Sequence, residues 1–276
     1  MTIIQALILG IVQGLTELLP VSSSAHLNVI PWILGWTENV AFTQEFKGSF
    51  DVALHFGTLI AIGMFFLKDW IKLIKAGFNK VVKKEDSVDG KIFWYLVIAT
   101  IPAGILALVL DKVSDMIIGD NFKLEMGLIA FALIIMGIIL AIVDKKAESK
   151  YKYEEITLKQ SVLVGISQAL AAAFPGVSRS GITMTIARAL KIDRESAAKF
   201  SFLLSTPIVA AAVLVDITEF ALTSAAFWIG VIASFIVGLI VVKFLMDYLK
   251  KGSFKGFAIY RILLGLIIFA LIFIRK

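Results

Sequence analysis

The first residues that could carry chemistry form a polar motif near the amino terminus, at the end of an apolar stretch. Gln13 and Glu17 are four residues apart, so on a helix they lie on one face. A proline ends that helix, and a turn containing Ser22 and Ser23 leads to His26. A carboxylate among apolar neighbours is costly unless a cation, a metal or a proton balances it, so Glu17 is the first functional candidate. His26 stands on weaker grounds, because a lone histidine is often a plain hydrogen-bonding group.

A second polar motif, residues 175–183, opens with Pro-Gly and continues with hydroxyl side chains around an arginine. These hydroxyls and the backbone amides of a turn offer donors, and Arg179 offers a planar fork suited to two phosphate oxygens. A helix that begins near Ser180 would add its amino-terminal amides. The alternative is that Ser178 and Ser180 cap a helix while Arg179 reaches a lipid headgroup. The residues predicted to cradle an anion are Ser178, Arg179, Ser180 and Thr183.

Together, the two motifs contain the parts of a phosphoryl-transfer site. Such a site needs positive charge and donors on the phosphate oxygens, a base or nucleophile, and commonly a metal that a carboxylate can hold. An anion transporter also uses broken helices, but it has little need of a histidine beside Glu17. A hydrolase elbow, G-x-S-x-G, is not supported, because Ser180 holds its last position and no strand is expected before it. Asp51 and His55, four apart, are either a cavity-lining pair or a structural ion pair.

The elements that position these motifs must be membrane helices. Of the 276 residues, 59% are hydrophobic and only 17% are charged, and the mean hydropathy is +0.92, so the chain cannot hide its apolar surface from water. The absence of Cys excludes disulfides and thiolate chemistry. The net charge of +6 lies mostly between apolar segments, so it indicates topology and not nucleic-acid binding. No cleavable signal is evident, and the first helix is expected to stay in the mature protein.

Two apolar segments, Ile3–Leu19 and Ser161–Phe174, carry polar residues and end in a proline followed by serines, which predicts re-entrant hairpins. Six other segments are long enough to span a bilayer. They are Phe50–Leu67, Ile92–Leu110, Glu125–Val143, Phe200–Val215, Ala225–Met246 and Phe257–Ile274. The lysine-rich connections are expected in the cytoplasm and the others outside. The lysine-rich connections are residues 68–91, 144–159, 188–199 and 243–255, and the others are 111–125 and 216–224.

An internal repeat relates the two hairpins. Gly10, Ile11, Gln13, Leu15, Pro20 and Ser23 recur at a constant offset of 155 as Gly165, Ile166, Gln168, Leu170, Pro175 and Ser178. Each half would hold one hairpin and three spans, and because three is odd, the second half must be inverted. We therefore expect an all-α integral membrane protein of six transmembrane helices and two re-entrant hairpins. It would form a single domain, 1–276, with inverted half-repeats of approximately 1–144 and 156–276.

At these residues the chain resembles the bacterial undecaprenyl-pyrophosphate phosphatases of the bacitracin-resistance type. One shared signature is (E/Q)-x-x-x-E, here Gln13 to Glu17, followed by Leu-Leu-Pro-Val-Ser-Ser-Ser-Ala-His26. The other is P-G-x-S-R-S-x-x-T at residues 175–183, and the resemblance covers nearly the whole chain. It implies removal of the terminal phosphate of undecaprenyl pyrophosphate, which recycles the lipid carrier for peptidoglycan synthesis and confers bacitracin resistance. It also implies a divalent cation, Mg2+ or Ca2+.

The resemblance assigns roles by position in the signatures. Catalysis falls to Glu17, Ser23, His26 and Arg179, metal binding to Glu17, and substrate binding to Gln13, Ser22, Ser178, Ser180 and Thr183. Many relatives have two acids in the first signature, whereas this chain has Gln13, which places the weight on Glu17. The nucleophile stays open between His26, Ser23 and a water.

The resemblance also implies a multi-pass protein of the bacterial inner membrane. Its active site would face the periplasm or the outside, with the isoprenoid tail in lipid between spans. The expected partners are this lipid and the membrane, with a homodimer as an open alternative and no nucleic acid. The alternative function is a transporter or flippase of phosphorylated isoprenoid lipids, which the inverted repeat would also suit. A non-catalytic scaffold is disfavoured, because it gives no reason for polar groups at two membrane-embedded turns.

Overall fold

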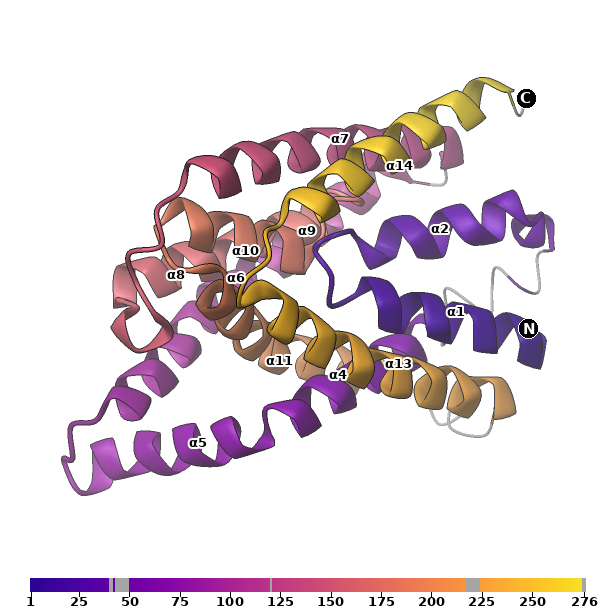
Figure 1. The fold of residues 1–276 in the computed structure, drawn as a ribbon. Helices are drawn as coiled ribbons and strands as arrows, with labels where there is room; N and C mark the ends of the chain where they lie inside the picture. The colour runs from indigo at the N-terminus through magenta and orange to yellow at the C-terminus, as the bar shows by residue number, and fades with distance from the viewer. Residues whose placement is uncertain (40–41, 43–49, 120, 217–223, 275–276) are drawn as a thin grey trace.

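The computed structural model describes residues 1–39, 42, 50–119, 121–216 and 224–274, and within these ranges the chain is all-helical, as expected (Figure 1). The first half contains α1 (Ile3–Thr16), α2 (Ser23–Ile33), η1 (Trp36–Glu38), α4 (Asp51–Phe65), α5 (Leu67–Val82), α6 (Val88–Ile118) and α7 (Phe122–Lys146). The second half contains η3 (Tyr153–Glu155), α8 (Leu158–Ser167), α9 (Leu170–Ala173), α10 (Arg179–Ala189), α11 (Arg194–Asp216), α13 (Ala225–Leu249) and α14 (Lys255–Ile274).

Five helices, α6, α7, α11, α13 and α14, are long and apolar enough to cross a membrane, and α4 with α5 makes a sixth candidate. The protein is therefore a multi-pass membrane protein. Most of these helices extend several residues beyond the predicted spans, since intrahelical hydrogen bonds do not stop where the apolar run stops. Most of the expected external connection 216–224 lies outside the described residues.

The prediction that residues 68–91 form a loop was wrong. The helix α4 has 15 residues and ends at Phe65, and the chain then turns by 73° into α5. Much of the predicted loop 68–91 is thus helical. The lysines that indicated a loop are interspersed with apolar residues along this helix. Of these apolar residues, Leu73 is buried, while Ile71, Ile74 and Phe78 are exposed. A helix with this pattern suits a membrane interface better than a loop or a span.

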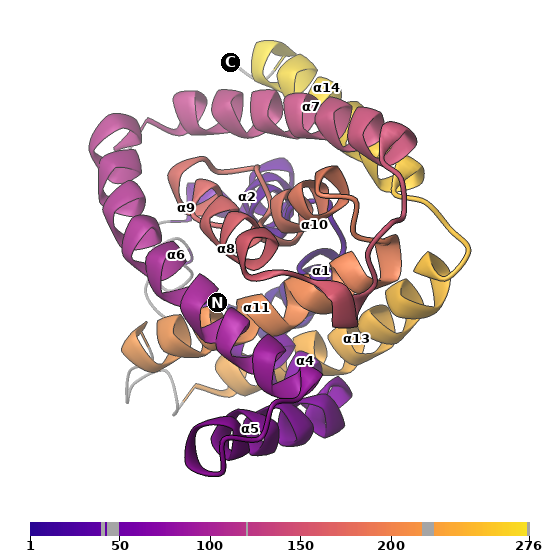
Figure 2. The same ribbon diagram turned by 90° about the vertical axis from the view of Figure 1, so that its left-hand side faces the viewer.

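The two predicted hairpins lie inside a ring of long helices. Seen from one end, α8, α9 and α10 occupy the centre, with α6, α7, α14, α13 and α11 around them (Figure 2). The first hairpin, α1–α2, lies at the end of the molecule that carries both termini, and α8–α10 lies toward the opposite end (Figure 1). Their turns therefore meet in the interior. The second hairpin has one break that was not predicted, between Ser167 and Leu170, which separates α8 from α9.

The end of α10 that lies away from the turn is fixed by a buried ionic cluster. The carboxylate of Asp144 at the end of α7 accepts hydrogen bonds from Arg188 Nε at 3.2 Å and Arg194 Nε at 2.7 Å. Arg188 is fully buried and also donates to several backbone carbonyls, among them that of Ile192 at 2.6 Å. Because every charge in this cluster has an opposite partner, α7, α10 and α11 are held together without an isolated charge.

Close helix packing explains one glycine. Gly57 in α4 faces α13, where an added Cβ would collide with the Ser234 hydroxyl and the Val231 carbonyl. Such contacts between small residues let membrane helices approach closely. We expect Gly57→Val to lower the free energy of unfolding by about 2 kcal/mol, the usual scale for overpacking.

Thermal unfolding in detergent, followed by circular dichroism, measures this loss. The control is Gly63→Val on the same helix, because a Cβ at Gly63 meets nothing within 4 Å. Equal melting temperatures for the two variants would contradict the packing argument.

Candidate active site

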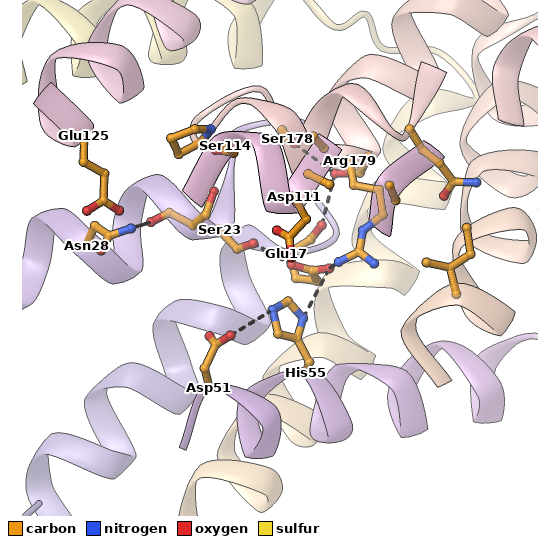
Figure 3. Close-up of a pocket in the computed structure, with 18 of the residues that line it drawn as sticks. Glu17, Ser23, Asn28, Asp51, His55, Asp111, Ser114, Glu125, Ser178 and Arg179 are labelled. Carbon is orange, nitrogen blue, oxygen red and sulfur yellow. Dashed lines mark hydrogen bonds and ion pairs between the residues drawn. The ribbon is translucent and has the colours of Figure 1, made fainter. Parts of the chain in front are cut away.

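A polar cavity of about 530 Å³ lies where the two hairpin turns meet (Figure 3). Its wall includes Glu17 and Ser23 from the first hairpin and Ser178, Arg179 and Ser180 from the second. Four other helices supply further wall residues: α4 with Asp51 and His55, α6 with Asp111 and Ser114, α7 with Glu125, and α11 with Ile208. The cavity therefore brings together the two sequence motifs, whose central residues Glu17 and Arg179 are 162 residues apart in the chain.

The centre of the cavity is the carboxylate of Glu17. One oxygen, Oε1, accepts a hydrogen bond of 3.1 Å from Arg179 Nη2, and the other, Oε2, accepts one of 2.5 Å from the Ser23 hydroxyl. The Glu17 side chain is 11% exposed and that of Arg179 is 24% exposed. Glu17 is thus a mostly buried carboxylate with the cationic partner that such a group requires. This ion pair joins the two sequence motifs directly.

A histidine from α4 completes this group. His55 Nδ1 lies 3.7 Å from Glu17 Oε1, and its Nε2 lies 3.8 Å from Asp51 Oδ2 (Figure 3). The side-chain amide of Gln13 is fully buried beside them, with Nε2 3.4 Å from Glu17 Oε2 and 3.2 Å from His55 Nδ1. Gln13 therefore orients Glu17 and His55 from behind the cavity wall. Asp51 and His55 both line the cavity and also lie within ion-pair distance of each other, so the structure shows features of both interpretations.

The two turns that carry the serines are built alike. Ser22 precedes α2 with φ of 75°, and Ser178 precedes α10 with φ of 69°. Residues other than glycine rarely adopt such positive φ values. Each hydroxyl caps its helix, at Ala25 N and Gly181 N respectively. Such backbone strain persists only where the surroundings enforce it, and it is common at active sites.

This likeness corrects the register of the repeat after the prolines. The constant offset of 155 pairs Ser23 with Ser178, whereas the matching caps pair Ser22 with Ser178 and therefore Ser23 with Arg179. The second turn contains one additional residue, Gly176, with φ of 91°. A fixed offset cannot detect a one-residue insertion. Ser23 and Arg179, the turn residues that donate to the Glu17 carboxylate, thus occupy equivalent positions in the two turns.

Several predicted site residues also hold the structure together, and some lie outside the cavity wall. The Ser180 hydroxyl donates to the carbonyls of Glu17 and Leu19, both at 3.1 Å, and so joins the two hairpins. Thr183 is buried, and its hydroxyl bonds the Arg179 carbonyl and the Ser201 hydroxyl. Thr183, like Gln13 and Ser22, therefore supports the cavity from outside its wall.

His26 differs most from its predicted place beside the reacting phosphate. It is buried, its Nδ1 lies 2.7 Å from the Ser22 carbonyl oxygen, and its Nε2 lies 2.7 Å from the Tyr260 hydroxyl, with the two rings stacked. Both nitrogens are thus occupied, Nδ1 by the serine turn and Nε2 by α14, and His26 is absent from the described cavity wall. In this arrangement His26 holds the serine turn, while His55 is the histidine that faces Glu17.

The sequence signal for His55 was its spacing of four from Asp51. That spacing fitted a cavity-lining pair and a structural ion pair equally well. We expect His55→Asn to lower kcat by about 100-fold, the lower end of the usual contribution of a positioned proton-transfer group. Phosphate release by the purified protein measures it. Asp51→Asn should cost less, because the Asp51 side chain is 46% exposed. An unchanged kcat in His55→Asn would make the pair structural.

The donor set limits what metal the site could hold. Among the described residues, no three His, Asp or Glu side chains are grouped so as to hold an ion. Glu17 is the one carboxylate at the centre of the group formed by Arg179, Ser23 and His55. The residues therefore fit a cation that takes most of its ligands from a bound phosphate and from water, as Mg2+ commonly does, and not an all-protein cage.

The geometry is suited to an anionic substrate. Arg179 uses one amino group on Glu17, which leaves other guanidinium N–H groups for an anion. The helix α10 begins at Arg179, so its amino-terminal amides and dipole also favour negative charge at this place. The same cavity holds a hydroxyl bonded directly to a carboxylate, which is the pairing that activates a nucleophile.

Comparison with known proteins gives a consistent result. Residues 6–267 match the family described as bacitracin resistance protein BacA. An undecaprenyl-diphosphatase of Pelotomaculum thermopropionicum is 43% identical over 100% of this chain and 99% of its own length. Undecaprenyl-diphosphatases of Moorella thermoacetica and Caldicellulosiruptor bescii are 42% and 40% identical, each over 100% of this chain and at least 99% of their own lengths.

Proposed function

This chain belongs to the bacitracin resistance protein BacA family, and from that membership we propose that it is an undecaprenyl-diphosphatase. It removes the terminal phosphate of undecaprenyl diphosphate, the same compound as undecaprenyl pyrophosphate, and leaves undecaprenyl phosphate and inorganic phosphate. This reaction returns the lipid carrier to peptidoglycan synthesis and confers bacitracin resistance. The observation that carries the proposal is the contact of Glu17 with both Arg179 and Ser23 in one polar cavity.

Substrate binding follows from the donors on the second hairpin. The diphosphate lies at the start of α10, where Arg179 exchanges part of its contact with Glu17 for phosphate oxygens. Ser178 and Ser180, which line the same wall, add hydroxyl groups. Because the surroundings are partly buried, these charge-assisted hydrogen bonds are stronger than they would be in water.

The chemical step uses Ser23 as the nucleophile. As Ser23 Oγ forms a bond to the terminal phosphorus, its proton passes to Glu17 Oε2, the oxygen it already contacts. The bond between that phosphorus and the bridging oxygen breaks, and undecaprenyl phosphate leaves. Water then attacks the phosphoseryl group, and as the bond between phosphorus and Ser23 Oγ breaks, the proton held by Glu17 returns to Oγ. Inorganic phosphate leaves, and Glu17 is a carboxylate again. Arg179 and the α10 amides stabilise the charge on the transferring group throughout.

A divalent cation, Mg2+ or Ca2+, is part of the proposal. Glu17, together with diphosphate oxygens, is the group of this chain that would hold it. When bound, such an ion neutralises charge on the diphosphate. We expect a chelator such as EDTA to abolish phosphate release, and added Mg2+ or Ca2+ to restore it.

That expectation is checked by titrating the cation back into the chelated protein. Folding, followed by circular dichroism, should be unchanged by the chelator, since no described cluster of side chains forms a structural metal site. Full phosphate release in excess EDTA would contradict a metal requirement.

The proposal places the cavity toward the outer side of the membrane. The support is the distribution of lysine: the segments 68–91, 144–159 and 243–255, which carry most of it, lie on the side away from the first hairpin (Figure 1). The isoprenoid tail would then remain in lipid between spans. A membrane-impermeant inhibitor that acts only from the cytoplasmic side would contradict this orientation.

The test of the function is phosphate release from undecaprenyl diphosphate by the detergent-purified protein. Multiple turnovers that produce undecaprenyl phosphate would establish the phosphatase. A folded protein that binds the lipid without releasing phosphate would favour the transporter or flippase, which the hairpin arrangement also suits. Activity with and without a lipid bilayer separates chemistry from movement across the membrane.

A further inference from the structure

A second arginine lies behind the two serine turns, on an element outside both motifs. Arg261 belongs to α14, and its side chain is completely buried. It donates from Nη2 to the carbonyls of Gly176 and Val177 at 3.1 and 2.8 Å, and from Nη1 to the carbonyl of Pro20 at 3.4 Å. One guanidinium group therefore contacts both hairpin turns at once.

The second turn leaves space for this guanidinium. An added Cβ at Gly181 would collide with Arg261 Nη1. Gly181 is also the residue whose backbone N–H is capped by the Ser178 hydroxyl. The glycine in the second motif thus allows an arginine from α14 to reach the turn that precedes α10.

Arg261 differs from the other fully buried arginine, Arg188, in its charge balance. Arg188 contacts the carboxylate of Asp144, whereas within the described ranges no acidic side chain lies within ion-pair distance of Arg261, and its Nε is without a hydrogen-bond partner. A buried arginine without an acidic partner is costly. A neutral donor could make the same hydrogen bonds to the turn carbonyls, so the positive charge of Arg261 requires another explanation.

An anion at the turns provides that explanation. The Val177 carbonyl points toward Arg261, and in a trans peptide the following N–H, that of Ser178, points the opposite way. Ser178 and Arg179 line the cavity, while Arg261 does not. The Arg261 charge thus lies behind donors that face a bound diphosphate, and in a partly buried site its attraction is only weakly screened.

We propose that Arg261 is a positioning residue for the diphosphate site, which holds the Pro20 and Gly176–Val177 turns in register and supplies the positive charge that balances the substrate. This inference rests on the proposed function for the identity of the anion. It assigns two separable contributions to Arg261: its planar fork positions the turns, and its charge attracts the anion. The contact with both turns supports the first, and the lack of an acidic partner supports the second.

Two variants separate these contributions. Arg261→Lys keeps the charge but loses the fork, so pyrophosphate affinity should stay within about 3-fold of wild type while kcat falls about 100-fold, the scale of a 1 Å misplacement. Arg261→Met removes both, so the Kd for inorganic pyrophosphate should also rise, by at least about 10-fold. Calorimetric titration with inorganic pyrophosphate measures the Kd without turnover, so this test stands even if undecaprenyl diphosphate is not the substrate.

The matched control is Arg188→Met, which removes an equally buried arginine remote from the cavity. It should lower the melting temperature but leave the pyrophosphate Kd of the folded protein unchanged. If Arg261→Met does not fold, Gly181→Ala replaces it, because the added methyl displaces the guanidinium without removing it and should lower kcat. The inference would be overturned if Arg261→Lys and Arg261→Met kept the kcat and Kd of wild type. Where Arg261→Met does not fold, wild-type kcat and Kd in Gly181→Ala would overturn it. A change in melting temperature alone would also overturn it.

Discussion

Replacing Arg179 with lysine is expected to lower kcat/KM for undecaprenyl diphosphate about 1,000-fold, which corresponds to about 4 kcal/mol of transition-state stabilisation. The arginine fork can contact Glu17 and phosphate oxygens at the same time, because its N–H groups lie in one rigid plane. A lysine ammonium is a single point charge and must choose between them. Initial rates of phosphate release across a range of substrate concentrations measure the change.

Arg194→Lys is the matched control for this variant. Arg194 also donates to a buried carboxylate, Asp144, and its side chain is 30% exposed, against 24% for Arg179. It lies in the ionic cluster at the start of α11, away from the cavity. Both variants lose a guanidinium group that can donate two parallel hydrogen bonds, but only Arg179→Lys should lose activity. Near-wild-type kcat/KM in Arg179→Lys would show that the phosphate does not bind at the start of α10.

Glu17→Gln is expected to lower kcat about 1,000-fold, because the amide keeps the size of the side chain but cannot accept the Ser23 proton. Ser23→Ala should cause a loss of similar size. Since the two residues act as a unit, the double variant should be little worse than either single variant. The kcat values of the three variants, measured at saturating substrate, test this.

Asp69→Asn provides the control for Glu17→Gln, because it also removes a carboxylate from a close ion pair, with Lys199 Nζ at 2.6 Å, but outside the cavity. Its kcat should match wild type. Additive losses in the Glu17→Gln, Ser23→Ala double variant would indicate independent roles. In that case a water activated by Glu17, and not the Ser23 hydroxyl, would be the nucleophile.

Much of the site could be predicted from short-range patterns. The spacing of four between Gln13 and Glu17 placed them on one helical face, and they are in contact. The residue types around Arg179 indicated an anion site before any contact was known, since few other functions need a guanidinium among hydroxyls inside a membrane. The apolar runs also predicted most spans, because the bilayer sets their length whatever the tertiary packing.

Other parts depended on the tertiary structure. Which histidine faces Glu17 is decided by the packing of α4 beside α1, and no spacing within the chain distinguishes His55 from His26 in that respect. The register of the second turn depends on the additional residue Gly176, whose positive φ appears only in the folded backbone. The 73° bend after α4 was also not predicted, because the lysines of α5 indicated a loop instead of a second helix.

Arg261 shows most clearly where the sequence reaches its limit. Alone in a terminal apolar helix, it has no neighbouring residue whose type suggests a partner. Its role arises from backbone carbonyls of two turns that are 241 and 84 to 85 residues away in the chain. The sequence by itself determined the membrane helices and the two chemical motifs, because helix periodicity and side-chain chemistry are local properties. The structure decided which groups meet, because those contacts form only when distant backbone segments pack together.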